Sequence, residues 1–184
     1  MKIKGTAVKT ILDYISEVHP EKKTDFLKGL PSASNEIFVN PIISSGWYDM
    51  DESMIIPTEK LGEMLGVSVE DAAWKLGRFS SEKLLKGAYK IFIRVSSPLF
   101  VLQRASNVMK AHYNPGNVAV IAKTKNSAVL KLTDFGDDEK FAAHRIGGWI
   151  EKTIEITGFK NVKVTVSKEN SSTDANYLIS PEWY

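Results

Sequence analysis

His112 is the residue of this chain whose type and position point most directly to chemistry. It lies near the end of a segment with helical apolar spacing, and Met109, three residues earlier, shares its helix face. An imidazole on such a helix is able to ligate a metal centre such as a heme iron, with the thioether as a weaker second ligand. The alternative is a histidine near a helix C-terminus that bonds a last-turn carbonyl and is favoured by the helix dipole. We favour this alternative, because an axial ligand also needs a pocket and anchors for the rest of the cofactor.

A second group of ionisable residues, the pair His144-Arg145 preceded by Asp137-Asp138-Glu139, suggests metal binding or acid–base chemistry. Asp138 and His144 are six residues apart, however, so they do not share a helix face. The acids are more simply explained as the start of a helix, whose positive end favours carboxylates. His19 precedes a proline at a helix end, and we expect it to be exposed.

Local motifs for catalysis are missing from the sequence. It has no Gly-x-Ser-x-Gly elbow, Walker loop or dinucleotide fingerprint, and Asp134-Phe135-Gly136 lacks the other signatures of a kinase. The absence of cysteine excludes thiol nucleophiles, disulfides, iron–sulfur clusters and thiolate zinc sites. We therefore predict no catalytic residues, and no metal site unless His112 binds heme. An enzyme whose site is assembled only in space ranks last among our hypotheses.

Composition limits the partners and the compartment. The chain has 184 residues, of which 24 are basic and 22 acidic, so its formal net charge is +2. This balance argues against a nucleic-acid partner, which would need a strong positive field. No apolar run approaches the ~20 residues of a spanning helix, so we expect no membrane span and a cytoplasmic location. The apolar content, 43% of residues, is enough for one core, and we predict a single domain over residues 1–184.

The spacing of apolar residues, which indicates the secondary structure that positions these residues, changes at Asn114-Pro115-Gly116. Before this turn, apolar residues recur at helical spacing, which predicts a mainly helical part over residues 1–113. One of its helices runs from about residue 98 to 113 and carries His112. The stretch 31–46, rich in Ser, Asn and Pro, should form short helical turns on the core. Helix stop and start signals occur at His19-Pro20, Pro57, Ser68 and Ser97-Pro98.

Two groups of side chains in this part have predictable environments, one buried in the core and the other exposed to solvent. The apolar residues of the loop region must be covered by the core, and these are Ile37, Phe38, Ile42, Ile43 and Trp47. A basic stripe at helical spacing consists of Lys83, Lys86, Lys90 and Arg94. We interpret this stripe as a solvated helix face, with an anionic partner surface as the second interpretation.

After the turn, the apolar period changes from helical spacing to two, which indicates strands. The pattern predicts a hairpin, a helix and a second hairpin over residues 118–132, 139–158 and 162–179. Because the strands come in hairpins and do not alternate with single helices, the sheet should be antiparallel. The predicted fold class is α+β, with an N-terminal helical part packed on a C-terminal sheet of two hairpins and one inserted helix (residues 114–184).

Gly147-Gly148 is an anomaly inside the last predicted helix. Each glycine should cost about 1 kcal/mol relative to alanine at such a position. We interpret the pair as a place where a strand or another helix approaches the backbone closely. Contact of this backbone with a bound ligand is the second interpretation.

Five short strings occur along the chain: Ser45-Gly46-Trp47-Tyr48, Gly77-Arg78-Phe79, Ser97-Pro98-Leu99-Phe100, Ile146-Gly147-Gly148-Trp149-Ile150-Glu151 and Ile156-Thr157-Gly158. Their order, together with the order of elements, resembles the heme-NO-binding (H-NOX) and 4-vinyl-reductase-like superfamily. Within it, the sequence looks most like a bacterial branch of the kind abundant in myxobacteria. The resemblance covers roughly residues 5 to 180 and implies a ligand-binding fold with a pocket between the helical part and the sheet.

In heme-binding relatives, the helix before the first hairpin carries the proximal histidine, and a Tyr-x-Ser-x-Arg motif on the sheet holds the propionates. Here Met109 stands where the resemblance places that histidine. The stretch Leu130-Lys131-Leu132-Thr133-Asp134 has neither the tyrosine nor the arginine. We therefore expect no cofactor, with heme as the alternative. The residues that we expect to line a ligand pocket are Trp74, Leu102, Ala105, Met109, His112 and Trp149.

These observations favour a non-enzymatic, heme-free ligand-binding or sensor-type domain that acts through a protein partner or as a homodimer. The ligand would be small and apolar or amphipathic. One alternative is a heme-based gas sensor for NO or O2 that uses His112. A second alternative is an interaction or scaffold module with a filled interior and an exposed apolar patch.

Overall fold

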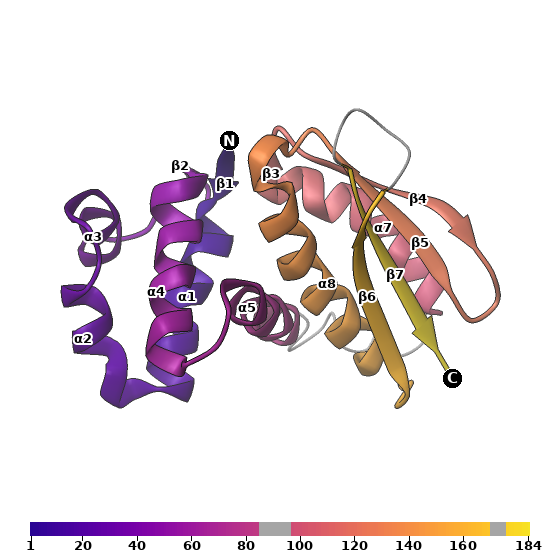
Figure 1. Cartoon of the computed structure of the whole chain (residues 1–184), viewed down its shortest axis with the longest axis horizontal. Coiled ribbons are helices and arrows are strands. Elements are labelled where there is room, and N and C mark those ends of the chain that lie inside the picture. The colour runs from indigo at the N-terminus through magenta and orange to yellow at the C-terminus, as the bar shows by residue number, and fades with distance from the viewer. Residues whose placement is uncertain (85–96, 170–175) are drawn as a thin grey trace.

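The computed structural model describes residues 1–84, 97–169 and 176–184, with helices at one end of the molecule and a sheet at the other (Figure 1). The helices are α1 (Gly5–Val18), α2 (Lys23–Lys28), α3 (Ser32–Val39), α4 (Ile56–Leu65), α5 (Val69–Leu84), α7 (Pro98–His112) and α8 (Glu139–Ile156). Short 3-10 turns cover Pro20–Lys22 and Gly136–Asp138, and a π-helical turn covers Asp51–Ile55. The strands are β1 (Lys2–Lys4), β2 (Trp47–Asp49), β3 (Tyr113–Asn114), β4 (Asn117–Lys123), β5 (Ala128–Thr133), β6 (Val162–Lys168) and β7 (Tyr177–Trp183).

The larger sheet has the strand order β4-β5-β7-β6, and each neighbouring pair is antiparallel. Its two hairpins, β4–β5 and β6–β7, meet where Leu130 of β5 pairs with Ile179 of β7. Both of these side chains are fully buried, and the residues that alternate with them are more exposed, so one face of the sheet is covered. The predicted α+β class and the order hairpin, helix, hairpin are confirmed.

Helices α7 and α8 cover this sheet, with α7 against β4 and α8 against β6 and β7. Helix α5 packs on α8, and α1 to α4 lie beyond α5, away from the sheet (Figure 1). A single cluster of buried apolar side chains runs from Ile3 to Trp183 through all these layers. No helix in the described ranges has the length and hydropathy that a membrane crossing requires.

The contact between α5 and α8 is made at backbone distance and explains the glycine pair. A Cβ atom on Gly148 would lie 2.2 Å from the carbonyl oxygen of Trp74, and one on Gly77 would lie 2.0 Å from that of Arg145. A Cβ on Gly147 would lie 2.5 Å from the indole ring of Trp74. Because real Cβ atoms do not approach so closely, only glycine permits this packing. The sequence predicted a close approach here, and the approaching element is α5.

A small three-stranded sheet of order β2-β1-β3 was not predicted from the sequence. Ile3, the central residue of β1, is fully buried and pairs with Tyr48 on one side and Tyr113 on the other. Tyr113, which we predicted as the last residue of a helix, is the first residue of β3. With only three residues in β1, the alternation Lys2, Ile3, Lys4 is too short to stand out as a strand.

Several details of the helical part differ from the sequence prediction. In the loop region, Phe38 is buried, but Ile43 is 64% and Trp47 is 38% exposed, so the core does not cover every apolar residue. The Lys4 ammonium lies 4.4 Å from the Trp47 ring centroid and shields part of it. His19 is half-buried, with its ring edge on Tyr14, and is not exposed as predicted.

The predicted helical residues from Leu85 to Ile93 lie outside the described residues. The same holds for Lys86, Lys90 and Arg94 of the predicted basic stripe. Lys83, the remaining member of the stripe, forms an ion pair with Glu17 of α1.

The first testable prediction concerns the glycine contact. Gly148→Ala should lower the free energy of unfolding by about 1–3 kcal/mol, because the new methyl group must push apart two helix backbones. Alanine's higher helix propensity, worth about 1 kcal/mol, opposes this loss and does not outweigh it. Urea denaturation followed by circular dichroism measures the effect.

Gly29→Ala is the matched control, because the nearest atom to its Cβ, at 2.4 Å, is Cε near the end of the flexible Lys60 side chain. Lysine can swing away, so this variant should stay within about 0.5 kcal/mol of the parent protein. Equal losses in the two variants would contradict the tight contact of α5 with α8.

Candidate functional site

A cavity of about 240 Å³ lies where α1, α5, α7 and α8 meet. Its described lining comes from all four helices and β3: Thr6, Ala7, Thr10, Asp13, Ser80, Lys83, Leu84, Val108, Met109, His112, Tyr113, Arg145, Ile146 and Trp149. The apolar members form much of the wall, and the charged members are few. This combination is typical of small-molecule sites, in which a few polar groups orient a ligand against apolar walls.

Three of the six predicted pocket residues, Met109, His112 and Trp149, line this cavity. Their role in ligand binding stays a prediction. Leu102 and Ala105 lie outside the lining, because the half of α7 that carries them is packed against β4 and the core. Trp74 also lies elsewhere, where its indole ring packs over Gly147 at the α5–α8 contact.

His112 makes the hydrogen bond that its position near a helix end favours. Its Nδ1 lies 2.8 Å from the carbonyl oxygen of Val108, one turn earlier on α7. Burial lowers the pKa of His112, and the charges of Arg145 and Lys4 act in the same direction, while the bond to Val108 opposes them. The neutral imidazole then donates from Nδ1 and keeps a lone pair on Nε2.

Arg145 is the residue whose environment departs furthest from the sequence interpretation. It was grouped with His144 at a helix start, yet its side chain is 5% exposed and lines the cavity. Its Nη1 donates to the hydroxyl oxygen of Tyr113 at 2.8 Å, and its Nε is buried with no hydrogen-bond partner. Sequence spacing gave no signal for this role, because Tyr113 reaches Arg145 only through the pairing of β1 with β3.

The acids before His144 lie at the start of α8, as the sequence interpretation favoured. In the described part of the chain, no group of three or more His, Asp or Glu residues is arranged to hold a metal ion. The His144 ring lies edge-on to Trp74, and burial lowers the pKa of His144. Glu139 accepts a hydrogen bond from the backbone N–H of Tyr177 and so ties the start of α8 to β7.

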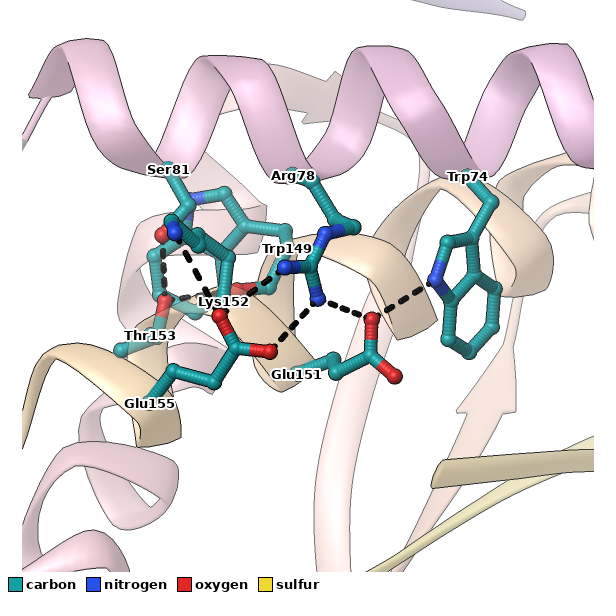
Figure 2. A network of polar contacts seen from close by, with 8 residues as sticks. All are labelled: Trp74, Arg78, Ser81, Trp149, Glu151, Lys152, Thr153 and Glu155. Atoms are coloured by element: carbon teal, nitrogen blue, oxygen red, sulfur yellow. Dashed lines mark hydrogen bonds and ion pairs between the residues drawn. The ribbon is translucent and has the colours of Figure 1, made fainter. Parts of the chain in front are cut away.

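A polar network fixes the position of α8 against α5, next to the cavity (Figure 2). The guanidinium of Arg78 bonds both carboxylate oxygens of Glu155, at 2.9 Å each, and also reaches Glu151. The indole N–H of Trp74 donates to Glu151 at 2.9 Å. Burial raises the pKa of Glu155, but the hydrogen bonds and charge of Arg78 outweigh this effect, and the pKa is lowered overall.

A second, buried polar contact between α5 and α8 joins the hydroxyl groups of Ser81 and Thr153, whose oxygens are 2.8 Å apart (Figure 2). Thr153 also donates to the carbonyl oxygen of Trp149, which lines the cavity. Two separate groups of polar contacts therefore join α5 to α8, an ion-pair cluster around Arg78 and a buried hydroxyl pair whose acceptor on Trp149 belongs to a residue of the cavity wall.

Comparison with known proteins supports the fold. No protein-family model and no curated protein matches the sequence. Among solved structures, the Fe(II) unliganded H-NOX protein from K. algicida aligns with a TM-score of 0.69 and 16% identity, over 99% of this chain and 97% of that one. The H-NOX protein from S. oneidensis in the Fe(II)NO ligation state gives a TM-score of 0.71 and 12% identity, over 99% of both chains. A mutant H-NOX from T. Tengcongensis gives a TM-score of 0.67 and 13% identity, over 98% of this chain and 97% of that one.

The chain therefore has an H-NOX-like fold over nearly its whole length, as the sequence resemblance implied. The solved structures hold iron in this fold, so we tested whether the residues present suit a heme. His112 offers a neutral imidazole, but the space beside it is about 240 Å³, below the roughly 300–1,000 Å³ of pockets for drug-sized ligands. A porphyrin is larger than such ligands. The cavity as formed is therefore smaller than a heme needs, and the close contact of α5 with α8 fixes one side of it.

The pKa shift of His112 generates the second prediction. Its folded pKa lies below the ordinary value of 6.5, so the unfolded chain binds the proton more readily as pH falls through 6.5. Stability should therefore decrease between pH 6.5 and 5. His112→Gln keeps a hydrogen-bonding side chain without this titration, so its stability should fall less over the same range. Urea denaturation of both proteins across this range measures the difference.

His144 shifts in the same direction, and thus the double variant His112→Gln/His144→Gln should show the flattest pH profile. A His112→Gln profile parallel to that of the parent protein would show that the His112 pKa is not lowered in the fold.

The third prediction concerns the network of Figure 2. Arg78→Ala removes a bidentate partner and leaves two half-buried carboxylates without it, so the unfolding free energy should fall by about 1–2 kcal/mol. Lys60→Ala breaks an exposed ion pair with Glu63 on α4 and should cost less than about 0.5 kcal/mol. Thermal denaturation ranks the two variants, and the reverse order would argue against a stabilising role of the network.

Proposed function

We propose that this protein is a heme-free ligand-binding domain of the sensor type, which binds a small molecule in the cavity between α1, α5, α7 and α8. The observation that carries the proposal is the position of this cavity in an H-NOX-like fold, with His112, Met109 and Trp149 on one wall. A fold can persist while its site changes, because apolar burial supplies most of its stability. We propose no enzymatic activity for the chain.

The polar groups of the described cavity wall support binding better than catalysis. The hydroxyl group of Ser80 donates to the carbonyl oxygen of Gly77 at 2.9 Å and is not held by a general base. Lys83 is engaged with Glu17, and the guanidinium of Arg145 donates to the hydroxyl oxygen of Tyr113. These groups can orient a ligand but do not form a nucleophile and base pair.

The signal would pass from the cavity to the sheet through α8. This helix supplies Arg145, Ile146 and Trp149 to the wall and packs against β6 and β7 on its other side. A ligand that prefers one position of α8 shifts the population toward it, and the outer sheet surface changes with it. We propose that a partner protein, or a second copy of the chain, senses that change.

A heme-based gas sensor is the second candidate function, because one observation favours it. The bond from Nδ1 of His112 to Val108 is the kind of contact that orients metal-ligating histidines and leaves Nε2 for the metal. If heme binds, His112 would be its protein ligand and the iron would supply the gas-binding chemistry. The size of the cavity argues against this candidate.

The fourth prediction separates the two candidates. Protein purified from cells supplied with a heme precursor should show no Soret absorption band, and native mass spectrometry should show no mass increment corresponding to heme. Adding hemin should produce no absorption change that depends on His112. The controls are His112→Ala and the matched histidine variant His144→Ala, which lies outside the cavity lining.

A Soret band present in the parent protein and in His144→Ala, but lost in His112→Ala, would overturn the proposal in favour of the heme sensor. A retained non-heme small molecule, released on denaturation and identified by its mass, would support the proposal directly.

A further inference from the structure

We propose that the cavity binds a small monocarboxylate, an organic acid with one short apolar group, whose carboxylate pairs with the guanidinium of Arg145. This inference rests on the proposed ligand-binding function and names the chemical class of the ligand. Neither the fold comparison nor the sequence resemblance suggests it, since Arg145 lies within helix α8 and not on the sheet.

The first step of the argument is that Arg145 is a buried charge without a counter-ion. Its side chain is 5% exposed, and among the described residues its guanidinium is bonded only to the neutral hydroxyl of Tyr113. Its Nε is shielded from solvent and has no hydrogen-bond partner. Burying a charge and a donor without partners is unfavourable in general, so a partner is expected for them. The cavity that Arg145 lines is the space available for such a partner.

The second step is the geometry of the donors that remain. The bond to Tyr113 occupies Nη1, at 2.8 Å, and fixes the orientation of the planar group. The edge formed by Nε and Nη2 presents two parallel N–H groups, and this fork matches the two oxygens of a carboxylate. A carboxylate on Nη2 is therefore the ligand group that would neutralise the charge, and Nε, which solvent does not reach in this structure, would join the fork only when the ligand binds.

The third step is the charge of the other groups on the wall. Lys83 already pairs with Glu17, and the lowered pKa of His112 keeps its imidazole neutral near pH 7. Asp13 adds a carboxylate to the lining. One guanidinium therefore faces the ligand, and the Asp13 charge repels a second negative charge on it. A monoanion suits this balance better than a dianion such as inorganic phosphate.

The fourth step is the size and polarity of the remaining space. Ala7, Val108, Met109, Ile146 and Trp149 give the wall an apolar surface beside Arg145. The volume of about 240 Å³ is below that of pockets for drug-sized ligands, so it suits one ring or a short chain. Benzoate and butyrate are suitable probes because each joins one carboxylate to one compact apolar group.

The fifth prediction tests this site by isothermal titration calorimetry with benzoate and butyrate, each paired with a neutral analogue, benzamide or butanol. Each acid should bind at least tenfold more tightly than its analogue, because only the acid pairs with the buried charge. Inorganic phosphate should not compete with benzoate. Arg145→Gln should weaken benzoate binding at least tenfold, whereas Lys60→Gln, which removes a cation of α4 outside the cavity lining, should change it less than twofold.

A direct measurement on the parent protein keeps the test valid if Arg145→Gln does not fold. In protein labelled with ¹⁵N, the Nε–H signal of Arg145 should move downfield on addition of benzoate and stay in place with benzamide. Benzoate binding without movement of this signal, or unchanged binding by folded Arg145→Gln, would overturn the inference.

Failure of this inference is distinguishable from failure of the proposed function. Binding of benzamide or butanol as tightly as the acids would refute the carboxylate site and leave a ligand-binding cavity in place. A heme Soret band that depends on His112 would refute the proposed function itself. If neither acids nor neutral analogues bind and the Arg145 Nε–H exchanges with a buried water, the inference fails, since water then satisfies the orphaned donor.

Discussion

The contact of α5 with α8 at backbone distance is the constraint on which the rest of this structure depends. Gly77 and Gly148 allow the two helices to touch, and the indole of Trp74 fills the space over Gly147. Because α8 also packs on the sheet, this one contact joins the helical end of the molecule to its β-structure. The Arg78 network adds a second set of contacts across the same interface, with partners that lie one turn apart on α8.

The sequence predicted those features that depend on neighbouring residues. Period-two alternation identified both hairpins, and Ser97 caps α7 by accepting from the N–H of Phe100 at 3.2 Å, as its position before Pro98 indicated. The cost of glycine within a helix indicated a close approach at Gly147-Gly148. It did not identify the partner, because nothing local to α8 specifies α5.

The candidate site was harder to predict for the same reason. The apolar stripe on α7 runs from Leu102 to His112 at constant helical spacing, yet the cavity occupies only its C-terminal end. The other end of the stripe is covered by β4, which begins at Asn117, beyond the end of the helix. Arg145 was missed because a single arginine in a charged helix normally reaches solvent. The hydrogen bond from Arg145 to Tyr113 of β3, which no local sequence pattern indicates, shows that the Arg145 side chain points inward.

Strand β1 connects the small sheet to the buried Arg145 through a strand pairing and a side-chain hydrogen bond, and not through helix packing. Ile3 lies in register between Tyr48 of β2 and Tyr113 of β3, and the phenol oxygen of Tyr113 accepts a hydrogen bond from the guanidinium of Arg145. One strand pairing and one side-chain hydrogen bond therefore connect the first strand with α8. Trp47, next to Tyr48 on the same ladder, is partly open to solvent. Tyr113 thus serves two elements at once, as a strand residue of the small sheet and as the hydrogen-bond acceptor of the buried guanidinium.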